Sequence, residues 1–322
     1  MYYKPRIVVS KCLEHGHCRY DGSMISSEFV RDMMPYVEFL PLCPEMAIGL
    51  PSPRESLRLI FKNDEFRLVS YKLGTDRTKA MSDYALEISK DISEFKPDGF
   101  ILKSRSPSCG PRDVKVYSDI GKAPPLPMKT SGIFAGGMSS VFPYILMEDE
   151  GRLMNFTIRE HFYTFVFTMA DFRETVLKDQ NMKSLIDFHS RNKYLFMAYS
   201  QAALKKLGVI AANHNRNGFS QVSEEYLGQL RTMLMNTPSK SRYINVMLHI
   251  LGYFKNQLSS DEKAHFLEML EQYRGSRIPQ SAIMSMLGSW GVRFKSEYLK
   301  GQTVFNPFPR ELARVTDSGK GL

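Results

Sequence analysis

The chain has 322 residues, 43% of them hydrophobic and 24% charged, with a formal net charge of +9. This composition predicts a globular protein long enough for two domains and excludes a disordered chain. Four cysteines at wide, unequal spacing favour metal binding or catalysis over a disulfide framework. No stretch approaches the ~20 apolar residues of a membrane span. Because the first apolar run is too short for a secretory signal, we expect a cytoplasmic protein without membrane partners.

Three cysteines each follow a run with strand character. The runs RIVVS, VEFLPL and GFIL predict strands, and the loops after them carry Cys12, Cys43 and Cys109, respectively. Between the strands, residues 26–36 and 75–95 have helical spacing of their apolar side chains. Strands alternating with helices predict an α/β domain with a parallel sheet. The carboxyl ends of parallel strands share one edge, so we expect the three thiols to meet there.

Three widely spaced thiolates suit a [4Fe-4S] cluster whose fourth iron lacks a protein ligand, and that iron would be an open Lewis-acid position. Mononuclear zinc on the same sulfurs remains an alternative at this point. Cys18, His15 and His17 could add a ligand, but each is more simply a loop residue, because a structural zinc site needs a second close ligand pair.

Polar side chains in the same three loops are candidates for chemistry on a substrate. Glu45 lies two residues after Cys43 and could exchange protons, although a solvated loop glutamate is an equal alternative. Pro44 between them is expected to hold back any helix. Ser106 flanks the point at which the third thiol must reach the sheet edge. The candidate substrate contacts are Arg19, Asp21, Arg54 and Ser108, and Arg19 with Asp21 could equally form a structural ion pair.

The net positive charge comes entirely from the second half of the chain. Residues 1–150 hold 20 Lys and Arg against 20 Asp and Glu, whereas residues 151–322 hold 23 against 14 and contain no cysteine. The second half shows helical patterns throughout, including one expected helix over 184–207 that Gly208 would end and another begun by a residue within 259–261. We therefore expect an α/β domain with the reaction centre at 1–150 and a basic all-helical domain at 151–322 that attracts a polyanion.

The three cysteine loops together resemble the thiouracil desulfidase family. The resemblance covers roughly residues 5–138 and is carried by SKCLEHGHCRYDG, by LCPE with GLPSPRE behind it, and by ILKSRSPSCG. It implies a [4Fe-4S] cluster held by Cys12, Cys43 and Cys109. It also implies that Glu45 and Ser106 match the catalytic carboxylate and serine of the family. The sequence departs from the family pattern at Cys18, where valine is more usual, and at Glu14, where an apolar residue is usual.

The second half resembles an uncharacterised helical domain that is found alone or fused behind desulfidase domains. Its matching stretches are FHSRNKYLFMAYSQAALKKLG, NVMLHILGYFKNQLSSDEK and YLKGQTVFNPFPREL. The fused arrangement is similar to that of tRNA 4-thiouridine desulfidases, which implies that the helical part holds tRNA. Candidate phosphate contacts in it are Arg191, Lys193, Lys205, Lys206 and Arg242, with Tyr194 and Tyr243 placed for stacking.

These observations predict a tRNA 4-thiouridine desulfidase that replaces thiocarbonyl sulfur by oxygen without net redox change. Glu45 would serve as general base or proton donor, and Ser106 would orient the uracil. The alternatives are a desulfidase of free thiouracil or thiouridine nucleosides and a non-catalytic Fe-S or zinc RNA-binding protein. No obligate protein partner is expected.

Overall fold

The computed structural model describes residues 2–314, which form two compact units. One comprises residues 2–170 with 311–314, and the other comprises residues 171–310. The division falls within helix α5 (Phe156–Phe172), later than the boundary expected after residue 150. Most of α5 packs in the first unit because Phe162 and Val166 are fully buried and lie directly beside Gly99. None of the helices within 2–314 combines the length and apolar character that a membrane span requires.

The first unit is built on a four-stranded sheet in which every neighbouring pair is parallel, as expected. Val8 lies in the central strand and pairs in register with Leu40 on one side and Phe100 on the other. The strand order across the sheet is β2 (Glu38–Leu42), β1 (Arg6–Ser10), β5 (Gly99–Leu102) and β8 (Met147–Asp149). The three strands that precede Cys12, Cys43 and Cys109 are therefore adjacent.

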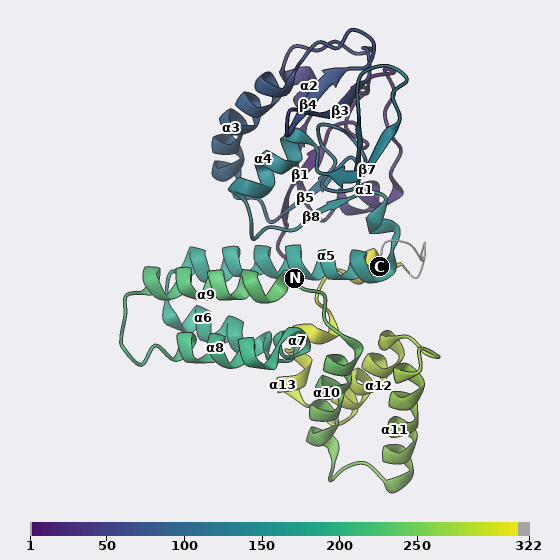
Figure 1. Ribbon diagram of the computed structural model, residues 1–322. Coiled ribbons are helices and arrows are strands. Elements are labelled where there is room, and N and C mark those ends of the chain that lie inside the picture. Colours follow the sequence, from purple (N-terminus) through teal and green to yellow (C-terminus); the bar gives the residue numbers. More distant parts are fainter. Residues whose placement is uncertain (1, 315–322) are drawn as a thin grey trace. The chain divides into compact units, whose positions relative to one another are not determined.

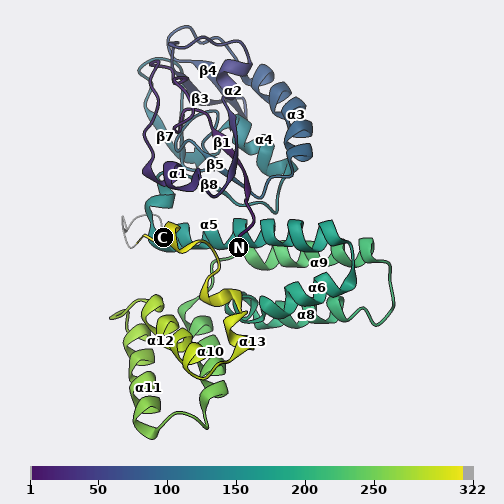
Figure 2. The ribbon, with the colours of Figure 1, turned by 180° about the vertical axis from the view of Figure 1, so that it is seen from behind.

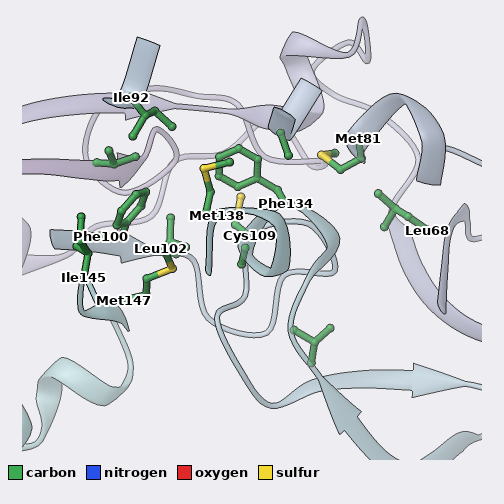
Figure 3. Close-up of a cluster of buried hydrophobic side chains, with 14 of the residues drawn as sticks. Leu68, Met81, Ile92, Phe100, Leu102, Cys109, Phe134, Met138, Ile145 and Met147 are labelled. Carbon is green, nitrogen blue, oxygen red and sulfur yellow. The ribbon is translucent and has the colours of Figure 1, made fainter. Parts of the chain in front are cut away.

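Two helices, α3 (Thr78–Phe95) and α4 (Ile133–Val141), lie side by side over one face of this sheet (Figures 1 and 2). Figure 3 shows that Phe134 and Met138 of α4 pack around Cys109, which is itself 7% exposed. Burial of this apolar surface fixes the end of the third cysteine loop against the helices.

Two shorter helices complete the α/β unit. Helix α1 (Glu28–Met33) has Ser27 as its N-cap. Helix α2 (Pro44–Ala47) begins at Pro44, so the expectation that this proline would hold back a helix was wrong. Proline is well suited to the first position of a helix, because the missing N–H would have no intrahelical partner there. As a result, Glu45 stands in the first turn of α2, directly after Cys43.

A second four-stranded sheet, which the sequence did not predict, combines two strands that follow the second cysteine loop with two that follow the third. Strands β3 (Leu57–Lys62) and β4 (Glu65–Ser70) form a hairpin whose turn residues Asn63 and Asp64 have φ of 53° and 59°. β3 also pairs in parallel with β6 (Val114–Tyr117), and β6 pairs antiparallel with β7 (Pro125–Thr130). The order is β4 (Glu65–Ser70), β3 (Leu57–Lys62), β6 (Val114–Tyr117) and β7 (Pro125–Thr130).

The second unit is helical, as predicted, but the single helix expected over 184–207 is three helices. They are α6 (Met182–Arg191), α7 (Lys193–Tyr199) and α8 (Gln201–Ala212). Ser200 begins α8, because its side chain accepts a hydrogen bond from the backbone N–H of Ala203 at 3.2 Å. Gly208 lies inside α8, and the helix ends instead at Asn213, which has a φ of 44°.

The remaining helices of this unit include one with the predicted start. Ser259 and Glu262 form a reciprocal capping box at the beginning of α11 (Ser260–Arg274). A π-helical turn, Arg173–Leu177, precedes α6. The other helices are α9 (Phe219–Leu234), α10 (Lys240–Leu251), α11 (Ser260–Arg274), α12 (Gln280–Arg293) and α13 (Glu297–Lys300).

Candidate active site

A cavity of about 360 Å³ lies at the carboxyl-terminal edge of the parallel sheet. The loops after β1, β2 and β5 all contribute to its wall, which is the arrangement expected for a site in an open α/β sheet. The predicted site residues that line it are Cys12, Cys43, Cys109, Glu45, Ser106, Arg19 and Arg54. A fourth cysteine, Cys18, lines the same cavity.

The four thiols are free, and neighbouring groups raise the pKa of three of them, Cys18, Cys43 and Cys109. The pKa of Cys18 is raised to about 11, first by hydrogen bonding with the Cys12 thiol, while the Cys43 thiol acts in the opposite direction. Hydrogen bonding with Cys18 and burial raise the pKa of Cys43. Burial, followed by the charge of Glu45, raises the pKa of Cys109. Cys18, Cys43 and Cys109 therefore keep their protons at neutral pH unless a bound cation displaces them.

The Cys109 loop is held by its own serine. Ser106 Oγ accepts hydrogen bonds from the backbone N–H groups of Cys109 at 3.1 Å and of Ser108 at 3.3 Å. The backbone N–H of Gly110 donates to the carbonyl of Ser106 at 2.9 Å, which closes the turn. Hydrogen bonds from the hydroxyls of Ser10 and Ser106 lower the pKa of Cys109 and partly offset its burial. Ser106 thus fixes the position of the third thiol and borders the cavity.

Glu45 is a paired, nearly buried carboxylate and not a solvated loop residue. Its Oε1 accepts a 2.8 Å hydrogen bond from Ser108 Oγ, and its Oε2 accepts from Nε of Arg54 at 2.9 Å. The side chains of Glu45 and Arg54 are 12% and 5% exposed. Arg54 also donates to the carbonyl of Cys18 at 3.0 Å, so one guanidinium ties the first and second cysteine loops together.

Two predicted substrate contacts occupy other positions. Ser108 is fully buried and is not among the residues that line the cavity. Its hydroxyl donates a hydrogen bond to Glu45 instead. Asp21 is also absent from the lining and accepts a hydrogen bond from Ser23 Oγ at 2.6 Å. Arg19 borders the cavity, but it donates to Ser23 at 2.9 Å and lies 3.3 Å from Asp21, which is the structural ion pair considered above.

Two lysines that were not among the predicted site residues, Lys11 and Lys103, also border the cavity. Lys103 Nζ donates to Ser104 Oγ at 2.8 Å and forms an ion pair with Glu150. The position of Lys103 directly after the predicted strand GFIL could have indicated that it borders the site. Within residues 2–314, no group of three or more His, Cys, Asp or Glu side chains is arranged to hold a metal ion.

The candidate RNA contacts in the second unit differ in their availability. Arg191 forms an ion pair with Asp171 at 2.8 Å, and Arg242 donates to the carbonyl of Tyr199. Lys205 and Lys206 are exposed on α8. Lys193 lies 5.6 Å from the ring centroid of Tyr194.

The two tyrosines proposed for base stacking are less accessible. Tyr194 is only 3% exposed and its hydroxyl lies 3.0 Å from that of Tyr253, so its ring is not open for stacking against a base. Tyr243 is half-buried.

Comparison with known proteins places the first unit in a family. The profile described as 2-thiouracil desulfurase matches residues 7–150. The uncharacterized protein YbbK of Bacillus subtilis (strain 168) is 33% identical over 110 residues, which are 32% of this chain and 72% of YbbK. The chain belongs to the 2-thiouracil desulfurase family.

Other similarities extend beyond the desulfurase region. The profile described as a protein of unknown function (DUF1722) matches residues 193–309. The uncharacterized protein YbgA of Escherichia coli (strain K12) is 27% identical over 128 residues, or 39% of this chain and 76% of YbgA. A solved structure described as the [4Fe-4S]-dependent thiouracil desulfidase TudS is 26% identical, has a TM-score of 0.38, and is matched over 93% of its length and 47% of this chain.

Proposed function

We propose that this member of the desulfurase family is a tRNA 4-thiouridine desulfidase that uses a [4Fe-4S] cluster. The reaction consumes water and exchanges the thiocarbonyl of the base for a carbonyl, with release of hydrosulfide and no net transfer of electrons. The observation that carries the proposal is the cavity at the sheet edge, where Cys12, Cys43 and Cys109 converge with Glu45 and Ser106. Membership in the 2-thiouracil desulfurase family supports the same chemistry.

The residue types in the wall of this cavity fit an iron-sulfur cluster, whose ligands bind different irons and need not be arranged around a single ion. Cysteine thiolates are the usual ligands of such clusters, and the cavity wall contains four cysteines, of which Cys12, Cys43 and Cys109 would hold it. The raised pKa values of Cys43 and Cys109 keep both thiols protonated, so binding of a cluster would require that iron displaces these protons. When bound, a cluster with three protein ligands supplies an open Lewis-acid position for the thiocarbonyl sulfur.

The protein's own contribution to the reaction centres on Glu45. Arg54 and Ser108 fix both carboxylate oxygens, so the group is oriented before a substrate enters. Placed in the cavity wall, the carboxylate is suited to accept a proton from the attacking water or to return one to the ring nitrogen. The hydroxyl of Ser106 borders the same space and is suited to hydrogen-bond the uracil.

The choice of tRNA as substrate rests on the second half of the chain. Its 23 Lys and Arg against 14 Asp and Glu would favour a polyanion, and Lys205 and Lys206 are exposed there. A base inside folded tRNA must turn outward to reach a cavity, and binding of the surrounding RNA would offset that cost. The name of the family favours free thiouracil as the competing substrate.

Release of hydrosulfide under anaerobic conditions separates these substrates. The reconstituted full-length protein is offered 4-thiouridine-containing tRNA, the 4-thiouridine nucleoside and 4-thiouracil, and kcat/KM is compared. We expect tRNA to be preferred by at least tenfold and Glu45→Gln to abolish release while RNA affinity persists. Equal or better turnover of the free base would assign the chain to base salvage, and RNA binding without hydrosulfide from any substrate would make it a non-catalytic binder.

A further inference from the structure

Cys18 is the one cysteine of the thiol cavity to which the proposed desulfidase chemistry gives no role. It lines this cavity together with Cys12, Cys43 and Cys109, and it is only 2% exposed. A buried cysteine packs as a small apolar side chain, but its thiol also undergoes oxidation and disulfide formation. The groups that its sulfur contacts therefore decide what this residue can do.

The sulfur of Cys43 lies against Cys18 at two points. The thiols of the two residues are hydrogen-bonded to each other, and Sγ of Cys43 lies 3.8 Å from the carbonyl oxygen of Cys18. A disulfide needs two side chains that point toward each other, because its sulfurs are only about 2.05 Å apart. The hydrogen bond between the thiols meets this condition, so a bond between the two sulfurs requires little movement of the backbone.

Arg54 keeps the loops that carry these two thiols in register. Its Nη1 donates to the carbonyl of Cys18 at 3.0 Å, and its Nε donates at 2.9 Å to Glu45, two residues after Cys43. The backbone N–H of Arg54 also donates to the carbonyl of Tyr20 at 2.7 Å. Because these hydrogen bonds come from protein groups alone, they hold the two sulfurs side by side before any cluster binds. Two reactive groups held in contact react far faster than the same groups free in solution.

The other two cysteines are less suited to pair with Cys18. Cys109 is packed among apolar side chains, and its thiol is hydrogen-bonded to Ser10 and Ser106. Cys12 hydrogen-bonds the Cys18 thiol and is the competing partner. Cys43 is favoured because its sulfur contacts both the thiol and the carbonyl of Cys18. Cys43 is also partly exposed in the cavity wall, so a small oxidant can reach it first.

We propose that Cys43 and Cys18 form a reversible disulfide when hydrogen peroxide enters the cavity before a cluster is bound. The peroxide transfers one oxygen to the sulfur of Cys43, which gives a sulfenic acid and one molecule of water. The sulfur of Cys18 then attacks that of Cys43, the S–O bond breaks, and the hydroxyl leaves as a second water with the Cys18 proton. The two thiols together lose two electrons, and the peroxide gains them.

The disulfide is a redox switch on cluster binding. The inference rests on the proposed cluster function, because the sulfur of Cys43 in a disulfide has no thiolate to bind iron. A dithiol reductant returns both thiols by exchange and makes the ligand available again. Without Cys18, further peroxide would carry Cys43 to sulfinic acid, which such reductants do not reverse. Cys18 thus protects a cluster ligand while the cluster is absent.

Mapping of the disulfide tests the proposal without any desulfuration. The full-length protein, prepared without a cluster, is treated with hydrogen peroxide, its remaining thiols are alkylated, and its tryptic peptides are identified by mass spectrometry. We expect two of the four thiols to be lost, a bond between Cys18 and Cys43, and recovery of all four thiols with dithiothreitol. Fragmentation of the peptide that contains both Cys12 and Cys18 identifies which of them is linked. Four free thiols, or a bond from Cys12 to Cys18, would overturn the proposal.

Two variants separate protection by Cys18 from general oxidation. Cys18→Val removes the second thiol but keeps a small apolar side chain, so after peroxide and dithiothreitol it should bind about fivefold less iron than the wild-type protein. Its Cys43 should carry sulfinic acid, which mass spectrometry detects. Cys12→Ala is the matched control, and it should still form the bond between Cys18 and Cys43. Equal recovery of iron binding in Cys18→Val would overturn the protective role, and if that variant misfolds, the disulfide map of Cys12→Ala decides.

The switch and the proposed function fail in different ways. A protein that releases hydrosulfide from thiolated tRNA, but keeps four free thiols after peroxide, would overturn the switch and leave the desulfidase in place. A reversible bond between Cys18 and Cys43 that blocks iron binding would uphold the switch even if no thiolated substrate reacted. A bond that leaves iron binding unchanged would overturn the switch, because Cys43 would then not be needed as a ligand.

Discussion

The hydroxyl of Ser108 donates a 2.8 Å hydrogen bond to Oε1 of Glu45, which joins the loop after β5 to the first turn of α2. Ser108 is fully buried and cannot exchange this partner for water. The contact places the proposed proton-transfer group and the Cys109 loop in one rigid arrangement. Glu45 is therefore oriented by the third cysteine loop as well as by Arg54.

Removal of that hydrogen bond should slow the reaction without loss of the cluster. A hydrogen bond to a charged group contributes about 1.5–3 kcal/mol, so Ser108→Ala should lower kcat about 10- to 100-fold. Measured iron and sulfide content should stay at the wild-type level, since no proposed ligand changes. Ser118→Ala, at an exposed position between β6 and β7, is the matched control. Loss of iron together with activity would instead assign Ser108 a role in holding the cluster.

Three of the four cysteines should be cluster ligands, and Cys18 should not be one. Alanine at Cys12, Cys43 or Cys109 should abolish iron binding, because each proposed ligand comes from a different loop. Cys18→Ala should retain iron, and it removes the hydrogen bond that raises the pKa of Cys43. Visible absorbance and iron analysis after anaerobic reconstitution measure the difference. Complete loss of iron in Cys18→Ala would make Cys18 a ligand.

Close backbone contact at Gly132 should make that position intolerant of any side chain. A Cβ there would lie 2.4 Å from the carbonyl oxygen of Ser108, so Gly132→Ala must displace the Cys109 loop. We expect a loss of about 1–3 kcal/mol in the free energy of unfolding, with reduced iron content. Gly228→Ala in α9 meets nothing within 4 Å and should stabilise the protein by about 0.5–1 kcal/mol. Denaturant melts of both variants check the contrast.

Glu160 and His161, which are adjacent in α5, should have opposite effects on the free energy of unfolding as the pH falls. Burial lowers the pKa of His161 to about 4 from 6.5, so the unfolded chain binds a proton below pH 6.5 that the folded chain excludes, and stability falls as the pH falls. Burial raises the pKa of Glu160 to about 7 from 4.5, so stability falls as the pH rises through that range. Between pH 4.5 and 6.5 the two slopes cancel.

Glu160→Gln should expose the effect of His161 alone. In that variant we expect the free energy of unfolding to drop by about 2 kcal/mol between pH 6.5 and 4.5, whereas the wild-type protein changes little from this pair. Urea unfolding at a series of pH values gives the comparison. Parallel pH profiles for the two proteins would contradict the opposing pair.

The exposed lysines and the ion-paired arginine of the helical unit should respond differently to substitution. Lys205 and Lys206 are exposed, so Lys205→Gln/Lys206→Gln should weaken tRNA binding and reduce its dependence on salt. Arg191 pairs with Asp171, and Arg191→Gln should instead lower stability because it leaves a half-buried carboxylate without its partner. Filter binding across salt concentrations and thermal melts distinguish the two classes. An unchanged salt slope in the lysine variant would place the RNA surface elsewhere.

The sequence by itself determined the parallel sheet and the convergence of its cysteine loops. The runs before Cys12, Cys43 and Cys109 had strand character and were separated by helical patterns, and parallel strands end at a common edge. The capping box at Ser259 was equally local, because its two members are three residues apart. Such features depend on short-range periodicity and chain direction, both of which are readable from the residues.

Only the tertiary structure decided what each side chain in the loops contacts. Ser108 donates to Glu45 across a sequence separation of 63 residues, and Arg58 lies between Tyr71 and Tyr117 from neighbouring segments of the second sheet. Gly208 was predicted to end a helix, yet α8 continues through it to Ala212 and is capped by Asn213. These outcomes depend on burial and on partners distant in the chain, and no local pattern of residues specifies either.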